Sequence, residues 1–380
     1  MNFQEPPPGF NSKSSKPPNF DEFSSKSWEG FGWTSLTVDG DLLNPTVTKC
    51  LSGILEDEVT VSSSGELDSS YLELSLSQLP SLCRTKNGSK RTQKLIAKSR
   101  PEQIEKVVEV LAPHVGELMN DLYGNYMCQT LFQSCSSKQR LVLLEGMKNH
   151  LVKIAQDPRG THSLQTIITL ANLPQEEEVY RQAFAGQVCS LATHNNASHV
   201  VQRLLATLKN KNFVIEEIQG SVKELATNKL GLCVVKKCVS DPRVMGELLT
   251  DPVALMQDPY GNYAIQHLLD CWTSQCSFPM VAALQGKILQ LCIQKYASNV
   301  IEKCLKHREM REAIVNEIIH DDKLYVLLNS QYGCYVLRTA AQLAEPELKA
   351  QLREVIVSKM QQLNQKKLGN RWTEILNELV

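Results

Sequence analysis

The segment LYGNYMCQTLF, residues 122–132, places a glycine before a set order of polar, aromatic and apolar residues. With it, eight segments share this order, and they are KNGSKRTQKLI (86–96), LYGNYMCQTLF (122–132), PRGTHSLQTII (158–168), NNASHVVQRLL (195–205), KLGLCVVKKCV (229–239), PYGNYAIQHLL (259–269), KYASNVIEKCL (295–305) and QYGCYVLRTAA (331–341). The third residue of each segment is small, namely Gly88, Gly124, Gly160, Ala197, Gly231, Gly261, Ala297 and Gly333. Successive gaps between these residues are 36, 36, 37, 34, 30, 36 and 36. Eight units at nearly one spacing predict a solenoid, in which each unit packs only on its neighbours.

The order within a unit predicts a helix. We call the residue after the small one position i. Positions i+2, i+3, i+6 and i+7 are mostly apolar, as in Val200, Val201, Leu204 and Leu205 of the fourth unit. At about 100° per residue these positions share one arc of a helix, and positions i, i+1 and i+4 share another. We therefore expect a core stripe and a separate non-core stripe on each helix, with the eight non-core stripes aligned on one surface. The departures from the pattern are Arg91, Thr92, Ser163, Leu232 and Cys233.

The remainder of each unit is also helical in pattern. KQRLVLLEGMKNHLVKIAQD (138–157) and REAIVNEIIHDDKLYVLL (311–328) are amphipathic, so we expect two or three helices per unit. We predict that the repeats occupy residues 76–345. Residues 346–380 are predicted to form capping helices, because a solenoid must cover its last apolar face.

Residues 1–75 differ from the rest in composition. They contain four lysines, no arginine and twelve acidic residues, a net charge of −8, and they are rich in Pro and Ser. A segment that buries so little apolar surface cannot offset its ordering entropy, so we expect a mostly disordered leader. Its aromatic residues fit chance, loose packing on the body, or a docking motif for a partner protein. The remainder carries 36 basic and 29 acidic residues, which is compatible with a polyanionic ligand.

The cysteines and the hydropathy of the sequence indicate the cellular compartment of the protein. The twelve cysteines include no CxxC pair, and most lie in apolar runs, which is typical of reduced cysteines used as small core residues. Reduced cysteines indicate a reducing compartment. The sequence has no apolar signal segment and no apolar run long enough to cross a bilayer, so we expect an intracellular protein.

The non-core positions carry the candidate binding residues. In chain order these are Ser89, Lys90 and Gln93; Asn125, Tyr126 and Gln129; Thr161, His162 and Gln165; Ser198, His199 and Gln202; Leu232, Cys233 and Lys236; Asn262, Tyr263 and Gln266; Ser298, Asn299 and Glu302; and Cys334, Tyr335 and Arg338. Amides and hydroxyls match the donors and acceptors of a base edge, and a ring at i+1 offers a stacking surface worth about 1–3 kcal/mol per base. The Glu302 carboxylate only accepts hydrogen bonds, which favours the N–H-rich edge of guanine.

These segments resemble the RNA-reading helices of the Pumilio, or PUF, family. The resemblance rests on Gly-Asn-Tyr-x-x-Gln at 124–129 and 261–266 and on Ala-Ser-Asn-x-x-Glu at 297–302. It implies an all-α, right-handed α-solenoid (a curved superhelix) of eight three-helix PUF repeats. PUF repeats are a known example of one base read per repeat. In the family the RNA runs antiparallel to the protein, with Asn/Tyr/Gln reading uracil, Ser/Asn/Glu guanine, and Ser or Cys with Gln adenine.

The resemblance also implies a target and a role. The target is about 5′-(U)GUNNNUA-3′ in mRNA 3′ untranslated regions, with relaxed choice at the central bases. In the first unit Lys90 replaces the usual stacking arginine, in the eighth Cys334 and Arg338 depart from the pattern, and in the fifth Lys236 is a candidate phosphate contact. The implied role is control of translation and mRNA stability in the cytoplasm, by a monomer without cofactor, metal, catalytic residue or membrane attachment. Protein co-regulators would bind the convex face or the leader.

Three other readings are possible on the residues alone. An armadillo- or HEAT-type scaffold also repeats helices, but it has no reason to place amides, rings and a carboxylate at i, i+1 and i+4. A divergent PUF-like protein could grip the nucleic-acid backbone with little sequence choice, as the irregular fifth and eighth units suggest. An enzyme is disfavoured because GxxxxGK[ST], GxGxxG, HExxH and GxSxG are absent from the sequence.

Overall fold

The computed structural model describes residues 76–362, 375, 377 and 378. All regular structure within 76–362 is helical, as the repeat pattern predicts. The predicted leader at 1–75 lies outside the described residues, as does most of the predicted cap beyond residue 362.

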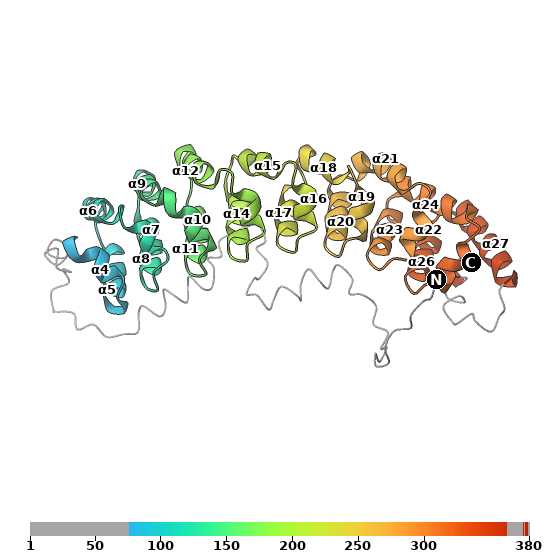
Figure 1. Cartoon of the computed structure of the whole chain (residues 1–380), viewed down its shortest axis with the longest axis horizontal. Helices are drawn as coiled ribbons and strands as arrows, with labels where there is room; N and C mark the ends of the chain where they lie inside the picture. The colour runs from blue at the N-terminus through green and yellow to red at the C-terminus, as the bar shows by residue number, and fades with distance from the viewer. Residues whose placement is uncertain (1–75, 363–374, 376, 379–380) are drawn as a thin grey trace, which may run out of the picture. The chain divides into compact units, whose positions relative to one another are not determined.

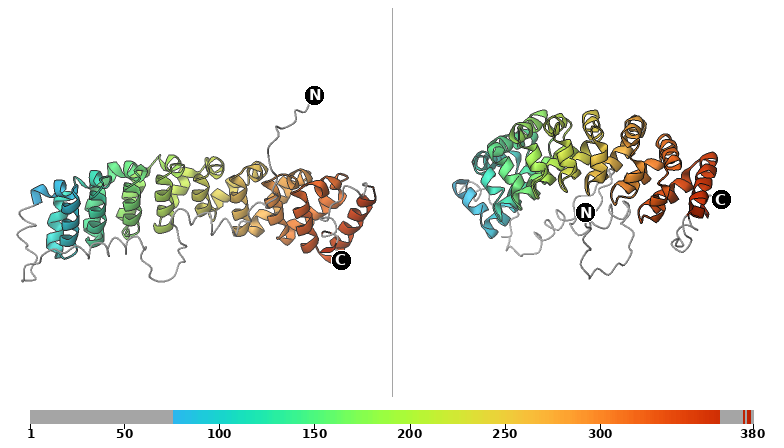
Figure 2. Two further views of the ribbon diagram at one scale, coloured as in Figure 1. Left: turned by 90° about the horizontal axis from the view of Figure 1, so that it is seen from below. Right: turned by 45° about the vertical axis from the view of Figure 1, so that its right-hand side comes forward.

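The eight predicted segments form one row of inner helices. These are α5 (Lys86–Ile96), α8 (Gly124–Ser134), α11 (Gly160–Ile168), α14 (Ala197–Thr207), α17 (Gly231–Cys238), α20 (Gly261–Cys271), α23 (Ala297–Leu305) and α26 (Gly333–Leu343). Seven of them begin at the small residue, and α5 begins two residues earlier. The inner row lies on the concave side of the bow formed by residues 76–362 (Figures 1 and 2).

Two further rows complete the three-helix units. The short middle helices are α4 (Leu79–Cys83), α7 (Val115–Leu118), α10 (Leu151–Gln156), α13 (Val188–Ala192), α16 (Val222–Ala226), α19 (Pro252–Gln257), α22 (Ile288–Cys292) and α25 (Leu324–Asn329). The outer helices are α6 (Pro101–Leu111), α9 (Ser137–Met147), α12 (Pro174–Phe184), α15 (Asn212–Ile218), α18 (Pro242–Leu248), α21 (Thr273–Leu284), α24 (Arg308–His320) and α27 (Pro346–Gln362). A 3₁₀ turn, η3 (Lys148–His150), lies between α9 and α10, and another, η2 (Leu76–Gln78), precedes α4.

The core follows the predicted apolar positions. In α23 the residues at i+2, i+3, i+6 and i+7 are fully buried, and each inner helix packs on the next one along the row. Each unit therefore covers the apolar face of its neighbour, which is the condition for solenoid stability. α27 takes the outer position after α26 and buries Leu352 and Ile356.

The glycine that begins several of the inner helices lies close to the backbone of the preceding middle helix. A Cβ added to Gly124 would lie 2.8 Å from the carbonyl oxygen of Leu118, and one on Gly261 would lie 2.7 Å from that of Leu255. Both carbonyls belong to the short middle helix of the same unit. The preceding turn is capped by a side chain, since Asp258 Oδ1 accepts hydrogen bonds from the backbone N–H of Tyr260 and Gly261. This cap and the small residue together fix where the inner helix begins.

Carboxylates on outer helices hold the turn through which the chain enters their own unit from the preceding one. Glu247 of α18 accepts the backbone N–H groups of Gly220 and Val222 at 2.8 and 2.7 Å. Glu317 of α24 does the same with the turn at Gly286. The clamped turns need a glycine, because Gly220 and Gly286 have φ of +84° and +73°.

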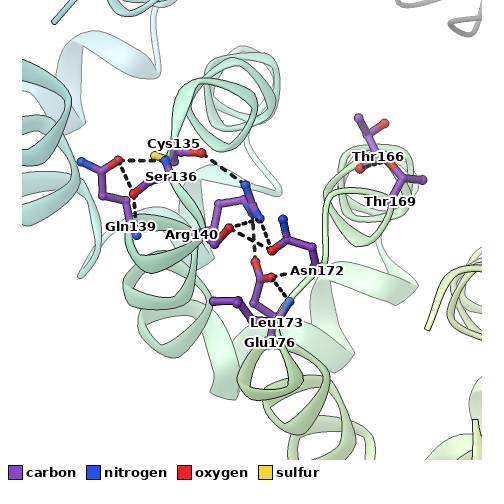
Figure 3. A network of polar contacts seen from close by, with 10 residues as sticks. Cys135, Ser136, Gln139, Arg140, Thr166, Thr169, Asn172, Leu173 and Glu176 are labelled. Carbon is purple, nitrogen blue, oxygen red and sulfur yellow. Dashed lines mark hydrogen bonds and ion pairs between the residues drawn. The ribbon is translucent and has the colours of Figure 1, made fainter. Parts of the chain in front are cut away.

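A buried ion pair links the second and third units. Arg140 of α9 donates to Glu176 of α12 at 2.9 Å, to the carbonyl of Cys135 at 3.2 Å and to Asn172 Oδ1 at 3.0 Å (Figure 3). The other carboxylate oxygen of Glu176 accepts the backbone N–H groups of Asn172 and Leu173, where α12 begins. The network thus ties two helices whose residues are far apart in sequence.

The two short repeat spacings have a local cause. α15 and α18, the outer helices after the fourth and fifth inner helices, have seven residues each, whereas α9 and α12 have eleven. The missing residues therefore come from the outer row, and the inner row keeps its register.

The cysteines behave as predicted where they are described. The described cysteines are all free thiols, and eight of them are buried. Burial raises the pKa of Cys83 to about 11 and that of Cys135 to about 12, so both remain protonated and apolar at neutral pH. Within the residues searched, no helix is long and apolar enough to cross a membrane.

Candidate nucleic-acid interface

Position i of each inner helix is buried, which corrects the expectation of a single non-core stripe. The buried residues at this position are Ser89, Asn125, Thr161, Ser198, Leu232, Asn262, Ser298 and Cys334. At about 100° per residue, position i lies only about 20° from the core position i+7, whereas i+1 lies on the far side of the helix. Exposure therefore rises from i through i+4 to i+1.

Most polar groups at position i are already satisfied by the protein. Asn262 Nδ2 donates to the carbonyls of Asp258 and Pro259, and Asn125 Nδ2 donates to those of the equivalent turn. Thr161 and Ser89 instead donate to carbonyls of the following unit, at Asn196 and Tyr123. The N–H groups of these asparagines are therefore used within the protein, and their Oδ1 atoms remain as hydrogen-bond acceptors.

The other four residues at position i are Ser198, Leu232, Ser298 and Cys334. Ser298 Oγ and Cys334 Sγ donate to carbonyls of their own preceding turns. Ser198 Oγ is buried and has no hydrogen-bond partner within the described residues. Leu232 has no polar side-chain group, so the fifth unit lacks this anchor.

The predicted stacking positions at i+1 are accessible. Tyr126 and His162 are exposed, and Lys90, His199, Cys233, Tyr263, Asn299 and Tyr335 are half-buried. Burial, together with the nearby His162, lowers the pKa of His199, so that ring is neutral at neutral pH. A neutral ring keeps its flat face available for base stacking.

The amides at i+4 are held by their neighbours. Gln266 Nε2 donates to Asn262 Oδ1 at 3.0 Å, and Gln93 Nε2 donates to Ser89 Oγ at 3.0 Å. Gln165 makes the same bond to Thr161 at 3.3 Å. The residue at i thus acts as a support for the residue at i+4, which is the one closer to solvent.

The remaining i+4 residues are half-buried, and they are Gln129, Gln202, Lys236, Glu302 and Arg338. Burial lowers the pKa of Lys236, the basic residue of the irregular fifth unit. Glu302 Oε2 accepts a hydrogen bond from Thr339 of the next unit at 3.3 Å. The structure therefore brings the i+1 and i+4 residues of successive units onto one side of the inner row.

Two features of this surface were missed from sequence. Position i+5 follows the i+4 residues and is basic in several units, with Lys94, Arg203, Lys237 and Lys303. Comparing position i+5 across the eight segments would have revealed these basic residues from the sequence. The second feature is Ser163, which the sequence marks only as a departure at a core position, although it bonds to residues of the second unit.

The fold and this surface define the class: a helical-repeat solenoid with amides, rings and a carboxylate set in series along its inner helices. Comparison with known proteins narrows the class. A model of the Pumilio-family RNA binding repeat matches residues 114–146, 253–284, 287–319 and 328–357, and one of the NOP9-like PUF repeat domain matches 145–240. A Pumilio domain-containing protein of Schizosaccharomyces pombe is 30% identical over 315 residues, covering 80% of this chain and 46% of that protein. Pumilio homolog 12 of Arabidopsis thaliana is 28% identical, covering 76% and 51%.

Solved structures agree with these relatives. The Puf4 RNA-binding domain, bound to the HO endonuclease RNA 3′ UTR recognition sequence, is 28% identical with a TM-score of 0.69, covering 78% of this chain and 97% of that one. The RNA-binding domain of yeast Puf5p, 21% identical with a TM-score of 0.70, shares the fold. The chain belongs to the Pumilio/PUF family. It spans about half the length of the curated relatives it matches.

Proposed function

We propose that this chain binds single-stranded RNA along its inner helices, with one base per unit where the i, i+1 and i+4 set is complete. The observation that carries the proposal is that the i+4 side chains follow one another along the inner row and are held by hydrogen bonds from the protein. Gln266 is held by Asn262, and Glu302 is held by Thr339. A side chain fixed in advance loses less entropy on binding a base edge. Family membership, and the RNA bound to the related Puf4 domain, also support it.

The proposed target is 5′-(U)GUNNNUA-3′. The seventh unit would read G through Glu302, because a carboxylate matches guanine N1–H and N2–H. The sixth and second units would read U through Gln266 and Gln129, and the first unit would read A. The fifth unit, with Leu232 buried and Lys236 half-buried, would contribute a phosphate contact rather than base choice.

The proposed cellular role is control of translation or mRNA stability through sites in 3′ untranslated regions, in the cytoplasm. The related Puf4 domain is bound to a 3′ UTR recognition sequence, which supports this choice of RNA. Regulation would act through protein co-regulators on the outer helices, because the inner helices would be occupied by RNA.

Selection from a random RNA pool tests the sequence choice. The full chain is expected to enrich an octamer with G at its second base and U at its third and seventh bases. The measurement is the base frequency at each position after several rounds of selection. RNA bound with no enriched GU-containing octamer would contradict sequence-specific reading.

A specific observation favours the unspecified centre, NNN, of this target. Residues 145–240 match the NOP9-like domain model rather than the general PUF repeat, and they contain the third, fourth and fifth inner helices. Selection would then enrich both ends of the octamer and leave the three central bases random.

We further propose that the acidic segment 1–75, of net charge −8, competes with RNA for the basic i+5 groups. Deleting residues 1–75 is expected to raise RNA affinity roughly 2- to 10-fold at low salt, with the gain lost at high salt because both attractions are screened. Fluorescence anisotropy at two salt concentrations measures this. A full-length control with the twelve acidic residues changed to Asn or Gln should match the deletion. Unchanged affinity at low salt would rule the competition out.

A further inference from the structure

The row of i+2 residues is apolar from the second inner helix onward, with one exception. It comprises Met127, Ser163, Val200, Val234, Ala264, Val300 and Val336, and Ser163 is fully buried on α11. A buried hydroxyl in an apolar layer costs free energy unless it is hydrogen-bonded. Ser163 must therefore be explained by the partners it finds.

Its partners are the reading residues of the preceding unit. Gln129 Nε2 on α8 donates to Ser163 Oγ at 2.6 Å, and Ser163 Oγ donates to Asn125 Oδ1 at 3.1 Å. Asn125 is fixed in turn, because its Nδ2 donates to the carbonyls of Asp121 and Leu122. The Ser163 hydroxyl therefore links Gln129 and Asn125, the two polar residues that the second unit would use to read a base.

The sixth unit provides a natural comparison. It has the same Asn, Tyr and Gln, but Gln266 Nε2 donates directly to Asn262 Oδ1, and the next unit has Val300 at its i+2 position. The same Asn, Tyr and Gln therefore have different hydrogen-bond partners in the second and sixth units. In the sixth unit the glutamine is held within its own unit, and in the second unit it is held by the unit that follows.

Holding Nε2 fixes the order of donor and acceptor on the amide. With Nε2 bound to the protein, Oε1 is the acceptor available to a base. Uracil has an N–H donor at N3, whereas cytosine has an acceptor there. An amide held by Nε2 therefore favours uracil, and an amide released to rotate by 180° would also suit cytosine.

We propose that Ser163 is a positioning residue that strengthens the base choice of the second unit from within the third. The proposal rests on the proposed function, because it concerns how that same surface discriminates. Its consequence is that the second unit's preference depends on a residue outside its own i, i+1 and i+4 set. With the same three residues, the second unit is therefore expected to prefer U over C more strongly than the sixth unit, which lacks the hydroxyl.

The test replaces Ser163 by two side chains of equal shape. Valine occupies this row position in four units, so Ser163→Val and Ser163→Thr fit the same space and differ only in the hydroxyl. Binding is measured with the selected octamer carrying U or C at its seventh base. The U-over-C ratio at the seventh base is expected to fall roughly 3- to 10-fold in Ser163→Val, toward the ratio that the sixth unit shows at the third base, because two hydrogen bonds through the hydroxyl are replaced by one direct bond between Gln129 and Asn125. Ser163→Thr should retain the original ratio. Ser163→Ala, matching Ala264 of the same row, should behave as Ser163→Val does.

Two controls separate positioning from general damage. The U-over-C ratio at the third base, read by the sixth unit, should be unchanged in all three variants. Val300→Ala disturbs the equivalent site beside the sixth unit without touching a hydroxyl, and it should leave the third-base ratio unchanged even if stability falls. Thermal unfolding followed by circular dichroism reports the folding of each variant.

The outcomes distinguish this proposal from the function on which it rests. If the unaltered chain shows no preference for U at the seventh base, the proposed function fails at that unit. If it prefers U but Ser163→Val and Ser163→Thr give the same ratio, or Ser163→Ala leaves the ratio unchanged, then Ser163 does not position Gln129 and only this inference is overturned.

Discussion

Replacing Arg140 with leucine is expected to lower the free energy of unfolding by about 3–5 kcal/mol, because the change leaves a buried carboxylate without its cation. The Glu176 side chain is 1% exposed. Arg140 donates hydrogen bonds to its carboxylate, to the carbonyl of Cys135 and to the Asn172 side chain. Water cannot replace the guanidinium at a site this buried. Urea denaturation followed by circular dichroism measures the loss as a lower midpoint.

Helix α12, which carries Glu176, also offers a matched control. Arg181 pairs with Glu178 on the solvent-facing side of α12, and both side chains are exposed. Arg181→Leu also removes one arginine, but solvent can take over the exposed carboxylate, so no measurable shift of the midpoint is expected. Equal losses for the two variants would contradict the structural role given to the buried pair.

The inner helices could be predicted from sequence because their signal is repeated and local. The apolar spacing of Val200, Val201, Leu204 and Leu205 requires one buried helical face, and a small residue begins seven of the eight helices. The packing reason for that small residue became clear only from the structure. Gly124 and Gly261 contact the end of a short helix whose position the sequence does not reveal.

The burial of position i could not be predicted from residue type. Asn125 and Asn262 are polar, and polarity placed them with the exposed residues. Their side chains are buried because the preceding turn supplies carbonyls that satisfy the amide N–H groups. Burial therefore depends on backbone geometry that a list of polar and apolar residues does not contain.

Hydrogen bonds between side chains of different units could not be predicted from the sequence either. Arg140 and Glu176 each occur in an amphipathic segment with several other charges, and nothing local selects them as partners. The same holds for Ser163, which looks like a weak core residue until α8 and α11 are packed together. These contacts join residues more than thirty positions apart, so they depend on how one unit stacks on the next.

Replacing Glu302 with glutamine is expected to reduce the preference for G over A at the second base roughly 10- to 100-fold. Two acceptor oxygens on a carboxylate match the N1–H and N2–H donors of guanine, whereas glutamine presents an NH₂ group to one of them. Hydrogen bonds to a charged group contribute about 1.5–3 kcal/mol, which corresponds to that range of affinity ratios. Glutamine suits adenine better, because adenine offers one donor and one acceptor.

The geometry of Glu302 makes the change specific. Thr339 donates to Glu302 Oε2 at 3.3 Å, so the carboxylate is oriented before any base arrives. A glutamine of the same shape can keep this contact through Oε1, which directs Nε2 toward the base. Discrimination should therefore shift while the fold and the other positions of the octamer are preserved.

Competition binding with octamers that differ only at the second base measures the ratio. Glu312→Gln on α24 is the matched control, because it removes the same charge from an exposed position on the outer row. It should leave the G-over-A ratio unchanged, which separates a local contact from a general loss of negative charge. If Glu302→Gln retained the original preference for G, the seventh unit would not read that base through its carboxylate.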